Sequence, residues 1–326
     1  MSNPNLKLPG SPASLSDADM LTTRRSFLLA LGSPLIGSLT VRRNYAAAIR
    51  QLAAGDVAPA RSALLSLVNA ERMAAGESSL GLDDMACLVA DQHALEMAQG
   101  KFLSHWGRDG RKPYNRYGDA GGFHAVQENV AAANKIESRT VSYIGFVLTE
   151  MHTRMYGEVS PNDGHRRTIL APQHTDVGFG IALSDRDLRL VELYVGKHIE
   201  LEPFPRKAKG KTTVQLHGKL LNPGYKLNYA EVFFEPQPTP PKIDWLQEPR
   251  PYSLPDEYRT IRLLAPKGSE YVDGVRGEIE VGRNGRFRIP VYLYQNEPGR
   301  YTVVICLSEL NGSKEFRATN ICIFGS

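Results

Sequence analysis

The stretch Gln127-Glu128-Asn129-Val130-Ala131 says more about the fold than any other segment of this 326-residue chain. It falls in a predicted short strand, residues 125–132, and carries one glutamate. Two histidine-bearing segments lie on either side of it in the sequence, Phe102-Leu103-Ser104-His105 and Gly164-His165-Arg166-Arg167. Histidine and carboxylate side chains bind divalent metal ions and transfer protons near neutral pH. Their meaning here depends on the local sequence around each of them.

The residues around this strand have the apolar spacing of helices and of a hairpin. Proline in the first turn favours one helix start, and Asp83 or Asp84 can cap another. The predicted helices span residues 59–75, 84–100 and from beyond Ser138 to Gly157, and the predicted hairpin pairs residues 175–184 with 188–199. The periodicity therefore predicts a small antiparallel sheet between helical layers.

Six segments in a fixed order, between residues 57 and 200, resemble the CAP family (the SCP/PR-1-like secreted domains), and in particular its bacterial branch. They are Leu67-Val68-Asn69-Ala70-Glu71-Arg72, Ala90-Asp91-Gln92-His93-Ala94-Leu95-Glu96-Met97-Ala98, Ser104-His105 with Asp109-Gly110, Gln127-Glu128-Asn129-Val130-Ala131, Gly164-His165-Arg166-Arg167-Thr168-Ile169-Leu170 and Val177-Gly178-Phe179-Gly180. The resemblance implies an α-β-α sandwich with a cleft that holds two histidines and two glutamates.

The resemblance places this tetrad at His105, Glu128, Glu150 and His165. Local motifs support three of the four, whereas Glu150 rests on helix geometry and spacing. Glu158, beyond the predicted helix end, is the alternative fourth member.

The third predicted helix has two apolar stripes and is therefore expected to pack on two sides. A glutamate in the second stripe would enter a packed environment and would need a cationic, metal or hydrogen-bonding partner. The first stripe consists of Val141, Ile144, Leu148, Met151 and Met155, and the second of Tyr143, Phe146, Val147 and Glu150.

The tetrad permits several kinds of chemistry. His105 and His165 can bind Zn²⁺ or a similar ion, and Glu128 or Glu150 can act as the catalytic base toward a metal-bound water. Catalytic zinc usually has three protein ligands, however, and two histidines make a weak site. A buried His/Glu hydrogen-bond network without a substrate is the structural alternative. His93 is interpreted as a packing residue.

Some positions depart from the family pattern. Gln127 stands where glycine usually precedes the Glu-Asn pair, and Thr168 replaces an asparagine that the bacterial branch often has. The third helix lacks the usual tryptophan, and the cysteine framework of the eukaryotic members is absent. Sterol or lipid binding by those members therefore transfers poorly to this chain.

Residues 1–48 are predicted to be a twin-arginine export signal with a flanking disordered tail. Thr23-Arg24-Arg25-Ser26-Phe27-Leu28 resembles the twin-arginine motif, and Ala46-Ala47-Ala48 offers small residues to a peptidase. The apolar run between them is too short and interrupted to span a bilayer. We expect a periplasmic or extracellular protein that meets the membrane only during export. A disordered basic tail is the alternative interpretation.

The formal net charge of +4 is concentrated near the start of the chain. Residues 1–48 hold five basic and two acidic residues, which leaves 34 basic and 33 acidic residues in the remainder. This balance provides no electrostatic footprint for nucleic acid. The basic run at residues 206–226 is interpreted as a solvated linker and edge strand.

Three cysteines cannot form a disulfide scaffold. Cys87 is expected to be a small buried residue on a helix. A hairpin turning near Asn311-Gly312 would pair Cys306 with a residue near Arg317, so Cys306 and Cys322 would not face each other directly. A bond between them in an oxidising compartment stays open.

From residue 209 onward the apolar period is two. Seven strands are predicted at residues 212–221, 229–235, 258–265, 274–281, 285–294, 300–308 and 316–324. Seven short strands favour an all-β, Ig-like sandwich, residues 206–326, with an accessory or adhesive role. The proline-rich segment 236–255, which carries Trp245, is predicted to be a long loop.

The sequence thus predicts an α+β protein with a CAP domain over residues 49–205. The first hypothesis is a binding protein for a cell-envelope, peptide or small apolar ligand, with or without a divalent metal. The second is a metal-dependent hydrolase of a peptide or cell-wall substrate. The third is a structural or adhesive protein whose tetrad only stabilises the fold. The oligomeric state is left open.

Overall fold

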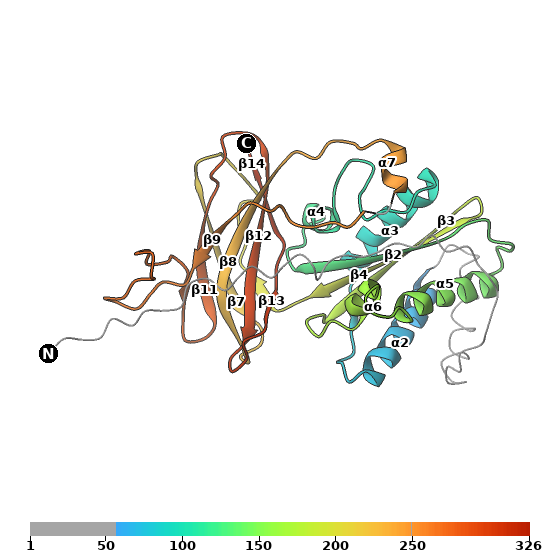
Figure 1. The fold of residues 1–326 in the computed structure, drawn as a ribbon, viewed down its shortest axis with the longest axis horizontal. Coiled ribbons are helices and arrows are strands. Elements are labelled where there is room, and N and C mark those ends of the chain that lie inside the picture. The colour runs from blue at the N-terminus through green and yellow to red at the C-terminus, as the bar shows by residue number, and fades with distance from the viewer. Residues whose placement is uncertain (1–56, 249) are drawn as a thin grey trace.

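The computed structural model describes residues 57–248 and 250–326 (Figure 1). The predicted export segment, residues 1–48, lies outside the described residues. We call residues 57–196 the helical unit and the described residues from 197 onward the β unit. Within the described residues, no helix is long and apolar enough to cross a membrane.

The helical unit is built around a four-stranded sheet. It contains α2 (Ala58–Ala74), β1 (Gly81–Leu82), α3 (Asp84–Gly100), α4 (Pro113–Asp119), β2 (Ala125–Ala133), α5 (Val141–Tyr156), α6 (Gly164–Ile169), β3 (Asp176–Ser184) and β4 (Asp187–Gly196). The strand order is β1-β3-β4-β2, with β1 parallel to β3 and the other neighbours antiparallel. The three predicted helices and the predicted hairpin are confirmed, and β2 lies at an edge of this sheet.

Two helical layers cover the two faces of the sheet. Helix α3 packs on one face, where Val191, Leu193 and Val195 of β4 belong to the first core cluster. Helices α2 and α5 pack on the other face against Leu190 and Tyr194 in the second cluster. Because neighbouring strand residues point to opposite faces, the alternation along β4 supplies both cores. The expected α-β-α layering is confirmed (Figure 1).

Helix α5 differs from the expectation of two packed sides. Its buried residues belong to one face, whereas Phe146 of the second stripe is 47% exposed and Glu150 is only half-buried. Spacing reveals an apolar stripe but not whether a neighbouring element exists to cover it. The prediction of a second packed side was wrong, and with it the argument that Glu150 must be carried into the interior.

The β unit contains two sheets around the third core cluster. Its elements are β5 (Ile199–Leu201), β6 (Lys207–Ala208), β7 (Thr213–Leu220), β8 (Tyr225–Pro236), α7 (Ile243–Gln247), β9 (Tyr258–Arg262), β10 (Glu280–Val281), β11 (Arg286–Tyr292), β12 (Gly299–Glu309), β13 (Glu315–Arg317) and β14 (Ile321–Gly325). One sheet has the order β10-β11-β7-β5, and the other β6-β14-β12-β8-β9, with β13 paired to β12. Assignment to the Ig-like class stays a prediction.

Three predicted boundaries in this unit are corrected. Strand β5 pairs with β7, so the sheet begins before the expected boundary at residue 205. Most of segment 274–281 is not a strand, because Gly274 and Gly277 have positive φ angles that interrupt an extended chain. The last predicted strand is divided into β13 and β14, and its middle turns toward the helical unit, where Ala318 accepts a hydrogen bond from the backbone of Ala125.

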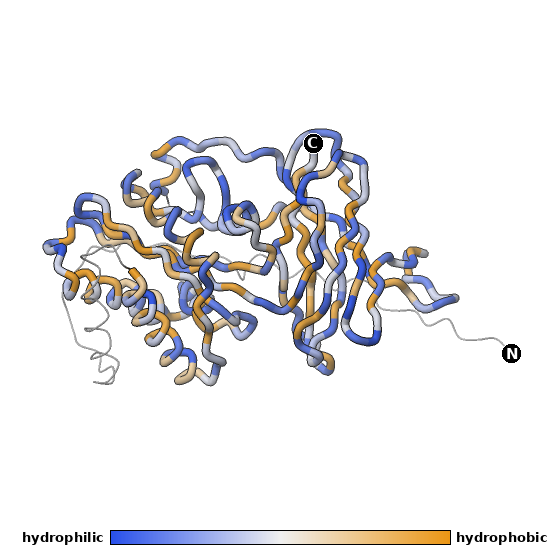
Figure 2. Tube along the Cα trace, turned by 180° about the vertical axis from the view of Figure 1, so that it is seen from behind, coloured by the Kyte–Doolittle hydropathy of each residue, from blue (hydrophilic) through white to orange (hydrophobic). Residues whose placement is uncertain are grey.

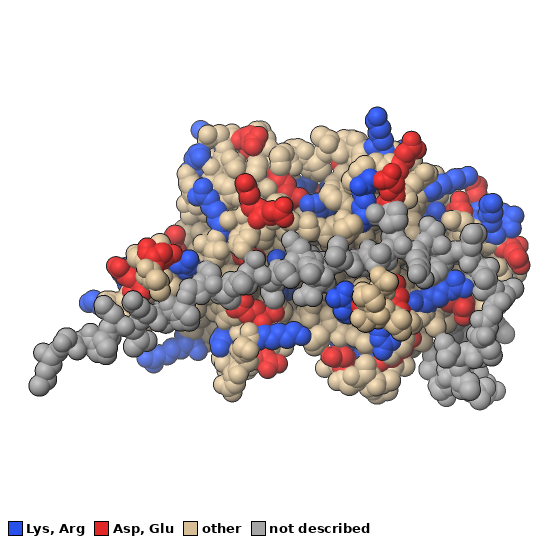
Figure 3. All heavy atoms as spheres, in the orientation of Figure 1, with Lys and Arg blue, Asp and Glu red and all other residues tan. Residues whose placement is uncertain are grey.

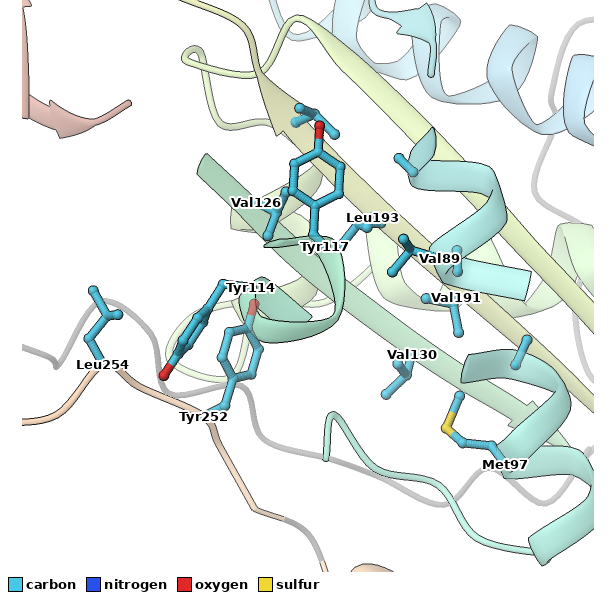
Figure 4. Close-up of a cluster of buried hydrophobic side chains, with 14 of the residues drawn as sticks. Val89, Met97, Tyr114, Tyr117, Val126, Val130, Val191, Leu193, Tyr252 and Leu254 are labelled. Carbon is cyan, nitrogen blue, oxygen red and sulfur yellow. The ribbon is translucent and has the colours of Figure 1, made fainter. Parts of the chain in front are cut away.

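The connection from β8 to β9 crosses onto the helical unit and returns (Figure 1). We call its described residues, 237–248 and 250–257, the strap. The sequence predicts a loop here, and the structure adds the short helix α7. Leu246, Tyr252 and Leu254 of the strap are buried in the first core cluster together with residues of α3 and β2. Figure 4 shows Tyr252 beside Tyr114, at the edge of this cluster. The two units therefore share a core.

Hydropathy and charge follow this architecture. Figure 2 shows hydrophobic residues along the strands and hydrophilic residues in many of the connecting loops. On the face drawn in Figure 3, basic and acidic side chains are intermixed. The three cysteines are buried and free. Cys306 pairs with Arg317 across β12 and β13, as predicted, whereas Cys322 pairs with Thr302.

Candidate functional site

Glu128 is the centre of a buried polar cluster on the α3 side of the sheet. Its Oε1 accepts a hydrogen bond from His105 Nδ1 at 3.0 Å, and its Oε2 accepts one from Arg116 Nη2 at 2.5 Å. All three residues are buried, and His105 is fully so. Two of the predicted residues, His105 and Glu128, are thus brought together, and Arg116 is a third member that the sequence did not reveal.

Neighbouring backbone contacts hold His105 in place. His93 Nε2 lies 2.6 Å from the carbonyl oxygen of Ser104, and Arg116 Nη1 donates to the carbonyl oxygen of His105 at 2.8 Å. His93 is 1% exposed on α3, so the predicted packing role is confirmed. The same guanidinium therefore orients both the histidine backbone and the Glu128 carboxylate.

Charge in this cluster keeps Glu128 ionised. Burial by itself would raise the pKa of Glu128, because a buried carboxylate loses hydration. The positive charge of Arg116, together with His93 and the hydrogen bond from His105, outweighs burial and lowers that pKa to about 2. Both carboxylate oxygens are occupied by donors, so Glu128 is a fixed anion at neutral pH.

The second predicted histidine, His165, belongs to another pair. Its Nδ1 lies 2.6 Å from Glu158 Oε1, and its backbone N–H donates to Glu158 Oε2 at 3.0 Å. The structure therefore gives His165 the alternative carboxylate, Glu158, in place of Glu150. Glu150 instead lines a small hollow with Ala131–Ala133, Val147, Met151 and Arg154.

Both His–Glu pairs are linked to neighbouring residues of the edge strand β2. Glu128 faces α3, like its strand neighbours Val126 and Val130 in the first core cluster. Asn129 faces the other way, and its Nδ2 donates to the carbonyl oxygen of His165 at 3.2 Å. Consecutive strand residues point to opposite faces, so the side chains of Glu128 and Asn129 lie on different faces of the sheet. Each predicted histidine is thus paired with its own carboxylate, His105 with Glu128 and His165 with Glu158.

The two pairs have the hydrogen bonds that commonly orient the histidine ligands of a metal ion. They do not supply enough direct ligands to hold one. A metal-binding histidine commonly donates its second ring N–H to a carboxylate, as both Nδ1 atoms are placed to do here. His165 Nε2 is buried without a hydrogen-bond partner in the described residues. However, residues 57–248 and 250–326 contain no group of three or more His, Cys, Asp or Glu that could hold a metal ion. This donor set does not fit a catalytic metal, which usually has three protein ligands.

The comparison with known families agrees with this architecture. Residues 65–196 match the model of the CAP family, described as the cysteine-rich secretory protein family. This segment is a CAP domain. The matched range runs from within α2 to the end of β4, so it contains both His–Glu pairs and stops before the β unit.

Solved structures similar to the chain include two bacterial surface or extracellular proteins. An extracellular protein containing a SCP domain, from Bacillus anthracis str. Ames, is 20% identical with a TM-score of 0.34, covering 42% of this chain and 40% of that chain. An outer surface protein from Borrelia burgdorferi is 17% identical with a TM-score of 0.36, covering 43% of this chain and 94% of that one. No curated protein matches the chain. The assignment rests on the family match, because these TM-scores are low.

The CAP domain also contains a buried network that the sequence did not reveal. His152 of α5 lies between two carboxylates, 2.6 Å from Glu192 Oε1 and 2.6 Å from Glu71 Oε2. Burial would lower the pKa of His152, but Glu192 and Glu71 outweigh it and raise that pKa to about 10. Glu192 also accepts from Tyr194 Oη at 2.8 Å. Glu71 lies in one of the segments that resemble the family, whereas no motif marks His152, Glu192 or Tyr194.

Proposed function

We propose that this chain is an exported protein whose CAP domain binds a cell-envelope, peptide or small apolar ligand at the His105–Glu128 site without hydrolysing it. The observation that carries the proposal is the state of Glu128. A general base works best when its pKa lies near the working pH and when it can reach the proton it removes. A carboxylate with a pKa of about 2 and two engaged oxygens meets neither condition. Glu128 therefore holds His105 and Arg116 in place, and the role that remains for the site is binding.

A binding assay with defined probes tests this proposal. Purified peptidoglycan fragments, a casein peptide mixture and dodecanoate are each equilibrated with the full chain, and bound probe is measured by mass spectrometry. We expect at least one probe to be retained by the wild type and lost tenfold or more in His105→Phe. Glu150→Gln should behave like the wild type. Equal retention by all three proteins, or cleavage of a probe by the wild type, contradicts the proposal.

Divalent-ion binding is a second candidate, favoured by the buried His165 Nε2 and by the carboxylate on each Nδ1. Calorimetric titration of Zn²⁺ into the wild type and into the His105→Ala/His165→Ala double variant tests it. Loss of binding in the variant is expected, and equal heats would remove the metal from the proposal. A metal-dependent hydrolase requires in addition that the zinc-loaded protein cleave a peptide or cell-wall substrate. A loaded but inactive protein counts against that hydrolase alone.

Export rests on the Arg24-Arg25 segment. Fusion of residues 1–48 to a reporter that must fold before translocation tests it. We expect export of the fusion and its loss when both arginines are changed to lysine, because the twin-arginine pathway reads the arginine pair. Export that survives this change would favour a different signal.

A further inference from the structure

The strap places a tyrosine directly on the His105–Glu128 site. The Tyr252 hydroxyl oxygen accepts a hydrogen bond from the backbone N–H of Glu128 at 3.0 Å. The ring centroid of Tyr252 lies 4.9 Å from that of His105. This N–H belongs to the side of β2 that does not face β4, so it is a group that an incoming ligand would otherwise meet. Tyr252 is only 7% exposed, so its side chain is buried against the site.

The helical unit also recognises the backbone on both sides of Tyr252. Trp106 Nε1 donates to the carbonyl oxygen of Pro251 at 3.3 Å. The carbonyl oxygen of Ser253 accepts from Lys112 Nζ at 3.0 Å and from Tyr114 Oη at 3.2 Å. The carbonyls of Pro251 and Ser253 alternate along the chain, and grooves lined by aromatic rings are a common way for proteins to hold extended proline-rich peptides.

Burial along the strap follows the pattern of a bound extended peptide. Pro251 is exposed, Tyr252 buried, Ser253 half-buried and Leu254 buried. Tyr252 and Leu254 thus point inward as two anchors, and Figure 4 shows both beside Tyr114. The adjacent helix α7 adds a contact in which Trp245 packs edge-on against Trp106, with ring centroids 5.3 Å apart.

We propose that the His105–Glu128 site is a receptor for an extended, proline-flanked peptide with a tyrosine and, two residues later, a leucine, and that residues 250–254 occupy it in the same chain. The inference rests on the proposed function, since it names the ligand class of that site. Because the strap is tethered at both ends, its effective concentration at the site is in the millimolar range for a short flexible linkage. A peptide of this class must displace the strap to bind.

The experiment opens the strap in the full-length chain. The probe is a dye-labelled peptide with the sequence of residues 250–256, Arg-Pro-Tyr-Ser-Leu-Pro-Asp, and binding is followed by fluorescence anisotropy. Tyr252→Ala should bind the probe at least tenfold more tightly than the wild type, whose site is occupied. Tyr292→Ala, at an exposed tyrosine on β11, is the matched control and should resemble the wild type. A probe with alanine in place of its tyrosine should bind none of the proteins.

A second measurement uses the wild type alone. The chain contains only two tryptophans, Trp106 and Trp245, and both lie at the strap contact. Unlabelled peptide at several millimolar should displace the strap and shift their emission to longer wavelength. The proposal is overturned if folded Tyr252→Ala binds the probe no better than the wild type. If that variant does not fold, an unchanged emission of the wild type at saturating peptide overturns it.

Failure of the strap proposal and failure of the proposed function give different results. If a cell-envelope or apolar probe binds the wild type at His105 while the tryptophan emission stays unchanged, the function holds and the strap proposal fails. If the strap peptide binds Tyr252→Ala and none of the other probes binds the wild type, the strap proposal holds and the broader function fails.

Discussion

At the scale of single residues, the site depends on how Glu128 is satisfied. Its carboxylate takes one donor from His105 and one from Arg116, and its backbone N–H donates to Tyr252. A buried carboxylate without such partners would favour its neutral form. The partners come from positions 12 to 124 residues away in the chain, so the ionised state of this one group depends on several elements packing correctly.

Glu128→Gln tests the ionised state through the pH dependence of stability. The pKa of Glu128 is lowered on folding, so its charge stabilises the protein above the unfolded value of about 4.5, and this contribution is lost as pH falls toward 2. The shift corresponds to on the order of 3 kcal/mol. The difference in unfolding free energy between wild type and variant, measured by urea titration, should shrink between pH 5 and pH 2. Glu150→Gln should show little difference, and a pH-independent gap for Glu128→Gln would contradict this account.

His152 gives a prediction at the opposite end of the pH scale. Its pKa is raised on folding to about 10, so the charged imidazole stabilises the protein fully below the unfolded pKa of about 6.5 and loses this effect as pH rises through 10. The melting temperature of the wild type should therefore fall more steeply between pH 7 and pH 10 than that of His152→Gln. The exposed His217→Gln serves as the control. Parallel slopes for all three proteins would rule out a charged His152.

Sequence patterns located part of the site and missed the rest for a physical reason. His105 and Glu128 were predicted because each lies in a segment with a recognisable order of residues. Arg116 and Tyr252 lie in segments without a chemical signature, and only the folded chain brings them to Glu128. Glu150 was preferred to Glu158 because helical spacing was the available criterion. Which glutamate pairs with His165 depends instead on the turn that follows α5.

At the scale of elements, the close approach of α3 to β3 shapes the helical unit. A Cβ added at Gly178 would lie 2.3 Å from the backbone of Ala86, and one at Gly180 would lie 2.1 Å from the backbone of Ala90. Real Cβ atoms do not approach backbone so closely, so these two glycines allow the helix to lie directly on the strand. Because α3 carries His93, this distance also affects the position of His105.

Gly180→Ala should consequently displace α3 and destabilise the protein. Overpacking in a close-packed core lowers the free energy of unfolding by roughly 1–3 kcal/mol. Backbone neighbours cannot rotate away as side chains can. Urea unfolding measures the loss. Gly282→Ala is the matched control, because its added Cβ would make only ordinary contacts, and it should change stability by less than about 0.5 kcal/mol. Equal stability of the two variants would mean that α3 adjusts freely.

The longer elements were predictable because their periodicity spans several turns or several strand residues. The short helices α4, α6 and α7 have five to seven residues and were not predicted, since so few residues do not establish a period. The second stripe of α5 shows the converse limit. Phe146 and its neighbours have the spacing of a buried face, but the chain supplies no described element to cover Phe146.

At the scale of the whole molecule, the main feature is the core that the two units share. The first cluster combines Phe233, Val304 and Cys306 of the β unit with α3, β2 and the strap. Arg300 of β12 adds an ion pair to Asp119 of α4 at 2.8 Å. The sequence suggested two domains joined by a linker, because periodicity changes once along the chain and long-range packing leaves no local trace.

Calorimetry should therefore detect one unfolding transition for residues 57–326. Removing the β unit from the shared core would expose apolar surface of the helical unit, at a cost of roughly 25 cal/mol per Å². We expect the calorimetric and van't Hoff enthalpies to agree, which is the criterion for a two-state transition. Leu254→Ala should lower the single melting temperature without dividing the peak. Two separated peaks in the wild type would show that the units unfold independently.

The position of the strap in the chain has a consequence for biosynthesis. A ribosome makes residues 57–196 before it makes Tyr252, and domains generally begin to fold in the order in which they emerge. As long as the nascent chain ends before Tyr252, the aromatic surface around His105 is therefore uncovered. Tyr252 is made more than fifty residues after Gly196, so a chain released before that point would leave the surface open to chaperones and to other nascent chains.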